Sequence, residues 1–344
     1  MSNAPLIVAR DPAWLAHRYD PQHDAFHFRH VPRARHDEAP FLTDEYLGPG
    51  EPVIARREEA MASAPEPAPI HFIFHSAYCC STMLARAMNL PGRAMGFKEP
   101  VILNDLVGWR HRGGEGRRVA MVLDHSLRLL ARPFGKGESI VVKPSNVVNP
   151  LIPAMLAMRP EARALLLFAP LDEYLASIAR KGMWGRLWVR DLLVKYIPEG
   201  IIDLGLAGED YLRLTDIQAA AVGWLAQHAL FARVAAQFGA DRIATLDSSR
   251  LTADPPRIFG DVARHFDLRL PEEAVAQVVA GPAFTSDSKS GGRFEEGQRA
   301  ASYRDGRALH AEEVGMVGEW ASKLAGNAGV AMTLPFALGK GAGT

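Results

Sequence analysis

Short apolar runs alternate along the chain with stretches in which apolar residues recur at helical spacing. Apolar runs at residues 70–74 and 164–168 are typical of buried strands. Residues 93–98, 138–143 and 241–246, which also include charged residues, are three further expected strands. Helical periodicity fills intervals between them, for example at 121–130. Strands that alternate with helices favour an α/β fold, with a parallel sheet flanked by helices.

Two of the helical stretches have clear boundaries. Apolar residues recur every three or four positions from Leu171 to Ile178, which predicts a helix that ends at Gly182. Thr215-Asp-Ile-Gln218 matches a capping box, in which two side chains satisfy backbone N–H groups at the start of a helix. We therefore expect a long helix from this box to Gly239.

The N-terminal part of the chain lacks this alternation. Residues 25–30 alternate well enough to predict a short strand, and residues 41–47 are typical of a helical turn. Three prolines stand among alanines between residues 60 and 69, as in a linker. We predict an N-terminal extension and linker over residues 1–68, followed by one α/β domain over residues 69–344.

The composition excludes several classes of partner. Lys plus Arg and Asp plus Glu each number 39 among 344 residues, so the zero formal charge argues against nucleic-acid and anionic-membrane surfaces. No apolar run approaches the roughly 18 residues of a spanning helix, and the N-terminus lacks a signal-peptide pattern. The only two cysteines are adjacent, a poor geometry for a structural disulfide, and the histidines lack metal-ligand spacing. We expect a soluble cytoplasmic protein without nucleic-acid, membrane or metal partners.

A strand, a loop of small residues and a helix follow one another between residues 70 and 88. Main-chain N–H groups at such a junction attract anions, and Ser81 and Thr82 add hydroxyl groups. The alternative is an ordinary strand-to-helix turn in which Ser81 caps the helix. The loop lacks the Gly-Lys-Ser/Thr ending of nucleoside-triphosphate sites, which argues against a kinase or an ATPase.

Two passages resemble a known family. Cys79-Cys-Ser-Thr-Met-Leu-Ala85 resembles the phosphosulfate-binding loop of the sulfotransferases, especially the bacterial Arg-Cys-Gly-Ser-Thr-Leu-Leu core, and Leu246 to Leu268 resembles a later strand–loop–helix passage of that family. The resemblance spans roughly residues 70 to 295. It implies a three-layer, P-loop-type α/β fold and 3′-phosphoadenosine-5′-phosphosulfate as the donor. The acceptor would be a hydroxyl or amine of a small molecule, and the transfer needs no metal.

The resemblance also implies residues that bind the donor. The 5′-phosphate would lie on the loop formed by Ser76, Ala77, Tyr78, Cys79, Cys80, Ser81 and Thr82. The 3′-phosphate would contact Ser177 and Lys181 on the helix after the fourth strand, and Lys289 in a late hydroxyl-rich loop. A disordered surface loop is the alternative for the segment around Lys289.

Three residues are candidates for the chemistry. Glu99 follows the second strand, where α/β sheets bind ligands, and a carboxylate there can take a proton from an attacking hydroxyl. Lys143 ends the third strand and can neutralise charge on the transferred group. His75, at the end of the first strand, is a third candidate contact. The alternatives are a solvated strand end for Lys98 and Glu99, a surface lysine for Lys143 and a plain loop histidine for His75.

Two departures from the family pattern leave other functions open. Tyr78 stands where the family's loop carries a cation, and Phe168-Ala169 stands where it carries an arginine for the 3′-phosphate. The second hypothesis is therefore a non-catalytic or repurposed member that binds a nucleotide or an anion. A third comes from Cys80 and Arg86, whose spacing fits a cysteine-dependent phosphatase.

Overall fold

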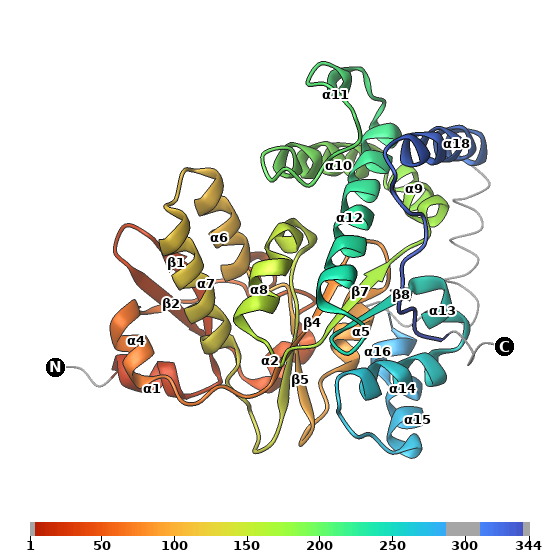
Figure 1. Ribbon diagram of the computed structural model, residues 1–344. Helices are drawn as coiled ribbons and strands as arrows, with labels where there is room; N and C mark the ends of the chain where they lie inside the picture. Colours follow the sequence, from red (N-terminus) through yellow and green to blue (C-terminus); the bar gives the residue numbers. More distant parts are fainter. Residues whose placement is uncertain (1–3, 287–309, 340–344) are drawn as a thin grey trace. The chain divides into compact units, whose positions relative to one another are not determined.

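The computed structural model describes residues 4–286 and 310–339, with side chains from residue 7 onward (Figure 1). The described residues form two compact units. The first comprises residues 4–74, 82–164 and 263–286, and the second comprises residues 75–81, 165–262 and 310–339.

A five-stranded sheet confirms the predicted α/β class. Its strands, in spatial order, are β5 (Ala94–Lys98), β6 (Ser139–Lys143), β4 (Ile70–His75), β7 (Ala164–Phe168) and β8 (Ile243–Asp247). Both β4 and β5 run parallel to β6. Each of the five strand segments expected from the sequence forms one of these strands. Their central residues are apolar because both faces of the sheet are covered.

Helices of the first unit accompany β4, β5 and β6. They are α5 (Ser81–Ala87), α6 (Ile102–His111), α7 (Gly116–Leu130), η1 (Asn146–Leu151), α8 (Ile152–Met158), α15 (Glu272–Ala280) and α16 (Pro282–Thr285). Helix α7 begins earlier than the expected 121–130 because the Glu115 carboxylate caps the N–H groups of Arg117 and Arg118. Helix α5 packs closely on β5, since a Cβ on Gly96 would lie 2.0 Å from the Ala85 carbonyl oxygen.

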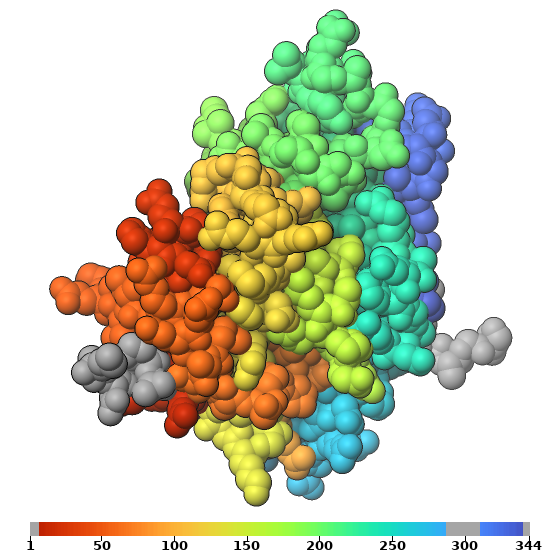
Figure 2. Space-filling view, turned by 60° about the vertical axis from the view of Figure 1, so that its left-hand side comes forward, coloured from red at the N-terminus to blue at the C-terminus, as the bar shows by residue number. Residues whose placement is uncertain are grey.

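The N-terminal residues form a small antiparallel sheet of their own within this unit. It consists of β1 (Trp14–Asp20), β2 (Ala25–His30) and β3 (Val53–Arg56), with the helices α1 (Ala4–Arg10), α2 (Arg33–Glu38), α3 (Asp44–Leu47) and α4 (Arg57–Ser63). The expected strand at 25–30 is confirmed as β2, and α3 lies within the expected turn at 41–47. Figure 2 shows these residues, red to orange, on one face beside the yellow residues of α6 and α7.

Buried polar contacts join the N-terminal sheet to the residues around the end of α7 within the first unit. The Arg132 guanidinium, 2% exposed, donates to the carbonyl oxygens of Val8, Asp11, Trp14 and Leu129. Without Arg132 these buried carbonyl oxygens would lose a hydrogen-bond partner. Arg132 therefore has a structural role: it stabilises the packing of the N-terminal segment on α7.

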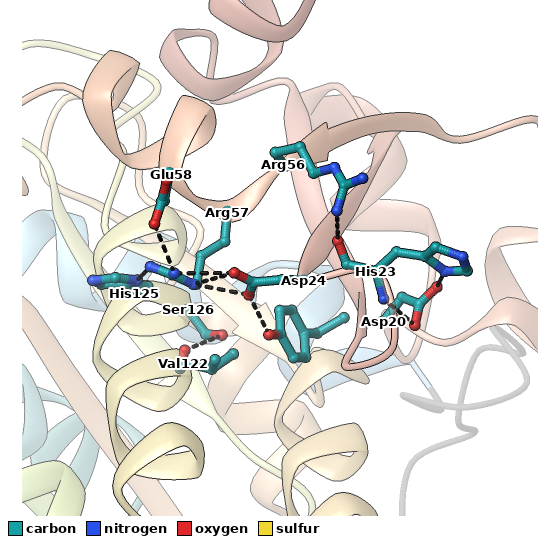
Figure 3. A network of polar contacts seen from close by, with 10 residues as sticks. Asp20, His23, Asp24, Arg56, Arg57, Glu58, Val122, His125 and Ser126 are labelled. Atoms are coloured by element: carbon teal, nitrogen blue, oxygen red, sulfur yellow. Dashed lines mark hydrogen bonds and ion pairs between the residues drawn. The ribbon is translucent and has the colours of Figure 1, made fainter.

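A second polar network lies between the N-terminal sheet and α7 (Figure 3). Arg57 pairs with both carboxylate oxygens of Asp24 at 2.9–3.1 Å and lies 3.5 Å from Nδ1 of His125 on α7. The Tyr19 hydroxyl donates to the same Asp24 carboxylate. Asp24 thus collects donors from β1 and α4, which fixes the β1–β2 turn against α4.

The second unit is mostly helical. Its helices are α9 (Leu171–Arg180), α10 (Gly182–Tyr196), α11 (Asp210–Arg213), α12 (Asp216–Phe238), α13 (Ser248–Ala253), most of α14 (Pro255–His265) and α18 (Ala311–Asn327). The capping box is confirmed: Thr215 accepts from the Gln218 N–H, and the Gln218 side chain accepts from the Thr215 N–H. Helices α10 and α18 both pack on α12.

Candidate functional site

The loop between β4 and α5 has an uncommon backbone. Ala77, Tyr78 and Cys80 have φ values of 72°, 53° and 61°, in the left-handed region that residues with a Cβ rarely adopt. Three such residues within four positions cost several kcal/mol, on the order of 1–2 kcal/mol each. Backbone strain of this kind persists where surrounding contacts determine it, and left-handed residues are a component of main-chain nests that bind anions.

Contacts within the second unit hold the start of this loop. The Ser76 N–H donates to the Leu167 carbonyl at 3.0 Å, and the Ser76 hydroxyl accepts from the Ala169 N–H at 3.3 Å. The Ala77 N–H donates to Nδ1 of His75 at 3.0 Å. The expectation that the main-chain N–H groups of Ser76 and Ala77 face an anion is therefore wrong, because both already donate to protein acceptors. His75, 4% exposed, shapes the loop through this bond.

Tyr78 brings no charge to the loop. Its ring packs edge-on against Tyr174 of α9 and Trp188 of α10, with centroids 6.0 and 5.5 Å apart. Burial raises the pKa of Tyr78 to about 12, so its hydroxyl is neutral at physiological pH. The side chain at the position of the family's cation is a packed phenol.

The two hydroxyl groups on the buried face of α9 lack hydrogen-bond partners among the described residues. They belong to Tyr174, which is fully buried, and to Ser177, which is 2% exposed. A hydroxyl that is buried without a hydrogen-bond partner destabilises the folded state. A bound polar ligand would supply the missing partner. Lys181 follows at the end of the same helix and is exposed. The Ser177 hydroxyl is therefore available to a polar ligand.

Glu99 and Lys143 meet in the first unit. Lys98 and Lys143 are paired residues of the parallel strands β5 and β6, and Glu99 directly follows β5 with a φ of 52°. The Lys143 ammonium forms an ion pair with the Glu99 carboxylate. Lys143 is 1% exposed and Glu99 is 20% exposed, so the cation is enclosed while the carboxylate remains accessible. The alternative reading of Lys143 as a surface lysine is wrong.

Thr82 lies beside this pair. It is buried near the start of α5, and its hydroxyl lies 3.5 Å from the Lys143 ammonium. Thr82, Glu99 and Lys143 come from three separated segments, yet all three belong to the first unit. The sequence named each of them as a candidate, and the fold places them together.

Lys98 contributes a second buried cation that sequence reasoning missed. Its side chain is 2% exposed, and its ammonium donates to the carbonyl oxygen of His36 on α2. Burial lowers the pKa of Lys98 to about 8, with a further contribution from the Arg86 charge. The alternative of a solvated strand end is therefore wrong for Lys98, because the N-terminal segment covers it.

The N-terminal segment also supplies two aromatic rings that the sequence did not flag. Phe41 and Tyr46 are partly exposed, and their ring centroids lie 5.3 Å apart in an edge-on arrangement. The Lys143 ammonium lies 5.0 Å from the centroid of the Phe41 ring. The two aromatic residues belong to no repeating pattern in this polar segment, so the sequence alone does not predict that they lie near Lys143.

Three further candidates remain, namely Lys289, Cys80 and Arg86. Lys289 lies outside the described residues. Cys80 is half-buried on the loop, and Arg86 is in the last turn of α5, where it acts on Lys98; the phosphatase hypothesis stays a prediction. Among the described residues, no group of three or more His, Cys, Asp or Glu side chains could hold a metal ion. No helix in the described part is long and apolar enough to span a membrane.

Comparison with known proteins gives matches among solved structures. No family model and no curated protein matches the chain. The sulfotransferase domain of the Synechococcus PCC 7002 olefin synthase is 16% identical with a TM-score of 0.41, covering 68% of this chain and 83% of that one. Sulfotransferase STF9 from Mycobacterium avium is 11% identical with a TM-score of 0.43, covering 73% and 78%. A sulfotransferase from Alicyclobacillus acidocaldarius is 16% identical with a TM-score of 0.38, covering 71% and 95%. These proteins carry the name of the family that the sequence motifs resemble.

Proposed function

We propose that this chain transfers a sulfuryl group from 3′-phosphoadenosine-5′-phosphosulfate to a hydroxyl or amine of a small-molecule acceptor. The observation that carries the proposal is the contact of an enclosed Lys143 cation with an accessible Glu99 carboxylate beside Thr82, all in the first unit. A cation that stabilises developing charge and a base that takes a proton are the two groups such a transfer requires.

Each residue of the pair has a distinct role. The donor supplies an activated sulfur whose bond to the 5′-phosphate oxygen breaks as the acceptor oxygen or nitrogen attacks in line. Glu99 accepts the proton that the acceptor loses, and its contact with Lys143 holds the carboxylate in place beside the cation. Lys143 stabilises the negative charge that develops on the transferred group and on the departing phosphate oxygen.

The loop and α9 would hold the rest of the donor. We assign the 5′-phosphate to the loop at residues 76–82, where Ser81 and Thr82 add hydroxyl groups at the start of α5. We assign the 3′-phosphate to Ser177 and Lys181, with Lys289 as a further predicted contact. The unsatisfied Ser177 hydroxyl supports this assignment, since a phosphate oxygen would satisfy it.

Binding of 3′,5′-adenosine bisphosphate tests the donor site directly. Isothermal titration of the wild-type chain should give a saturable binding curve, and Ser177→Ala should weaken binding by about tenfold or more, as expected for a lost hydrogen bond to a charged group. Ser126→Ala is the matched control, because Ser126 is also a buried helical serine but donates to the Val122 carbonyl (Figure 3). Absence of measurable wild-type binding at high micromolar bisphosphate would overturn the proposal.

The packed phenol of Tyr78 favours one second candidate, a non-catalytic binding protein. A neutral residue replaces the cation expected on the loop, and losing one such electrostatic contact typically lowers a rate by about 10²–10³-fold. Tight binding of the bisphosphate without sulfate transfer to a broad panel of acceptors would support this alternative. If Tyr78→Lys or Tyr78→Arg transfers sulfate where the wild-type chain does not, the missing positive charge at this position explains the inactivity of the wild type.

A further inference from the structure

The main chain fixes the N-terminal segment 41–47 against the end of β5. The Leu42 N–H donates to the Lys98 carbonyl at 2.7 Å, and the Val101 N–H donates to the Leu42 carbonyl at 3.3 Å. These bonds lie on either side of Glu99 in the sequence. The segment therefore holds a set position relative to Glu99, and its side chains are built into this part of the first unit.

Basic side chains on β1 and β2 hold the middle of the segment. Asp44, the first residue of α3, accepts from Nε2 of His17 at 2.6 Å and pairs with Arg18. Arg29 on β2 lies 3.7 Å from the same carboxylate. Three basic side chains on one carboxylate restrict the short helix that carries Tyr46, so both aromatic residues of the segment are preorganised.

The two rings lie beside the proposed reacting groups. Phe41 is within cation–π distance of Lys143, at 5.0 Å. Tyr46 lies within the electrostatic reach of Glu99: its pKa is raised by burial and by the charges of Glu45 and Glu99. Both rings are of intermediate burial, so part of each ring surface remains open to solvent. Exposed aromatic surface next to a few polar groups is typical of small-molecule sites.

We propose that Phe41 and Tyr46 form an aromatic wall of the acceptor site, and that the acceptor is a phenol-type compound with its hydroxyl on an aromatic ring. This inference rests on the proposed function. Edge-on and offset contacts with the wall would orient the ring so that its hydroxyl reaches the Glu99 carboxylate. The chemistry of the base agrees, because a phenol with a pKa near 10 gives its proton to a carboxylate more readily than an alkyl alcohol does.

The acceptor inference is tested separately from the donor site. Binding of 2-naphthol, and of decahydro-2-naphthol as its saturated counterpart, is measured by titration into the chain saturated with 3′,5′-adenosine bisphosphate. The wild-type chain should bind the aromatic compound more tightly by about three- to tenfold, the range expected for an aromatic pair. Phe41→Leu should abolish this preference and leave the affinity for the bisphosphate unchanged.

Further variants separate the wall from general effects of losing an aromatic residue. Tyr46→Leu should also weaken 2-naphthol binding, and Tyr46→Phe should retain it because the ring remains. Phe134→Leu is the matched control, since Phe134 is partly exposed in the same unit but contacts Arg33 and His36. Equal binding of the aromatic and saturated compounds, or an unchanged preference in Phe41→Leu, overturns the aromatic wall and leaves the proposed function standing. Failure of the wild-type chain to bind the bisphosphate overturns the proposed function itself.

Discussion

The unequal burial of Glu99 and Lys143 predicts that the two single variants differ in stability. Glu99→Gln leaves the Lys143 ammonium, 1% exposed, without its carboxylate, and breaking a buried pair in this way costs about 3–5 kcal/mol. Lys143→Met leaves a carboxylate that is 20% exposed, so water replaces part of the lost contact and we expect a cost of about 1–2 kcal/mol.

The double variant Glu99→Gln/Lys143→Met isolates the interaction. It removes both charges, and replacing a buried ion pair by neutral groups is often close to neutral for stability. We expect the double variant to be more stable than Glu99→Gln alone, with a coupling free energy of about 2 kcal/mol or more. Such coupling would show that Lys143 needs Glu99 in the folded state.

Urea unfolding, followed by both far-ultraviolet circular dichroism and tryptophan fluorescence, measures these free energies. Coincident transitions from the two probes are required, because a chain with two compact units can unfold in steps. Glu313→Gln is the control: it breaks the partly exposed Arg186–Glu313 pair of the second unit and should cost under about 1 kcal/mol. If Glu99→Gln unfolds at the same urea concentration as the wild type, the enclosed cation does not depend on Glu99 and the reasoning is wrong.

Three other predictions concern buried charged and titratable groups. Burial lowers the pKa of Lys98 to about 8 from 10.5, so the unfolded chain binds more protons between these pH values and the free energy of unfolding should rise by about 3 kcal/mol from pH 8 to 10.5. Urea unfolding across this pH range should show the rise in the wild type and not in Lys98→Met. Burial lowers the pKa of His228 to about 4 from 6.5, so its stability contribution is complete above pH 6.5 and disappears as pH falls to 4; a wild-type acid-unfolding profile no steeper than that of His228→Phe would contradict this. Arg132→Lys should destabilise the chain by about 2–4 kcal/mol, because one ammonium cannot reach four carbonyl oxygens; thermal unfolding measures the loss, and an unchanged midpoint would exclude this structural role of Arg132.

Local patterns in the sequence predicted the strands of the sheet and helices such as α9 and α12, whereas α10 and α18 were not predicted. Runs such as Ala164–Phe168 are apolar throughout because both faces of the strand are buried, and a local pattern carries that information. The capping box at Thr215 is equally local, since its partners are three residues apart. The position of polar residues at strand ends was enough to select Glu99 and Lys143 as candidates.

The surroundings of these candidates depend on contacts that no local pattern encodes. Lys98 resembles a solvated strand end in the sequence, and it is buried only because α2 from the N-terminal region covers it. Phe41 lies beside Lys143 because main-chain bonds join Leu42 to the end of β5. Strands β1 and β3 were missed because antiparallel pairing with β2 determines them more than their own composition does.

The main-chain bonds between Leu42 and the end of β5 have a consequence for how this chain can be shortened. A polypeptide starting at residue 69, the expected domain boundary, would lack the cover over Lys98 and the ring beside Lys143. Water would then hydrate both ammonium groups and weaken their electrostatic influence on any bound anion. Truncation should therefore impair ligand capture even if the remaining sheet still assembles.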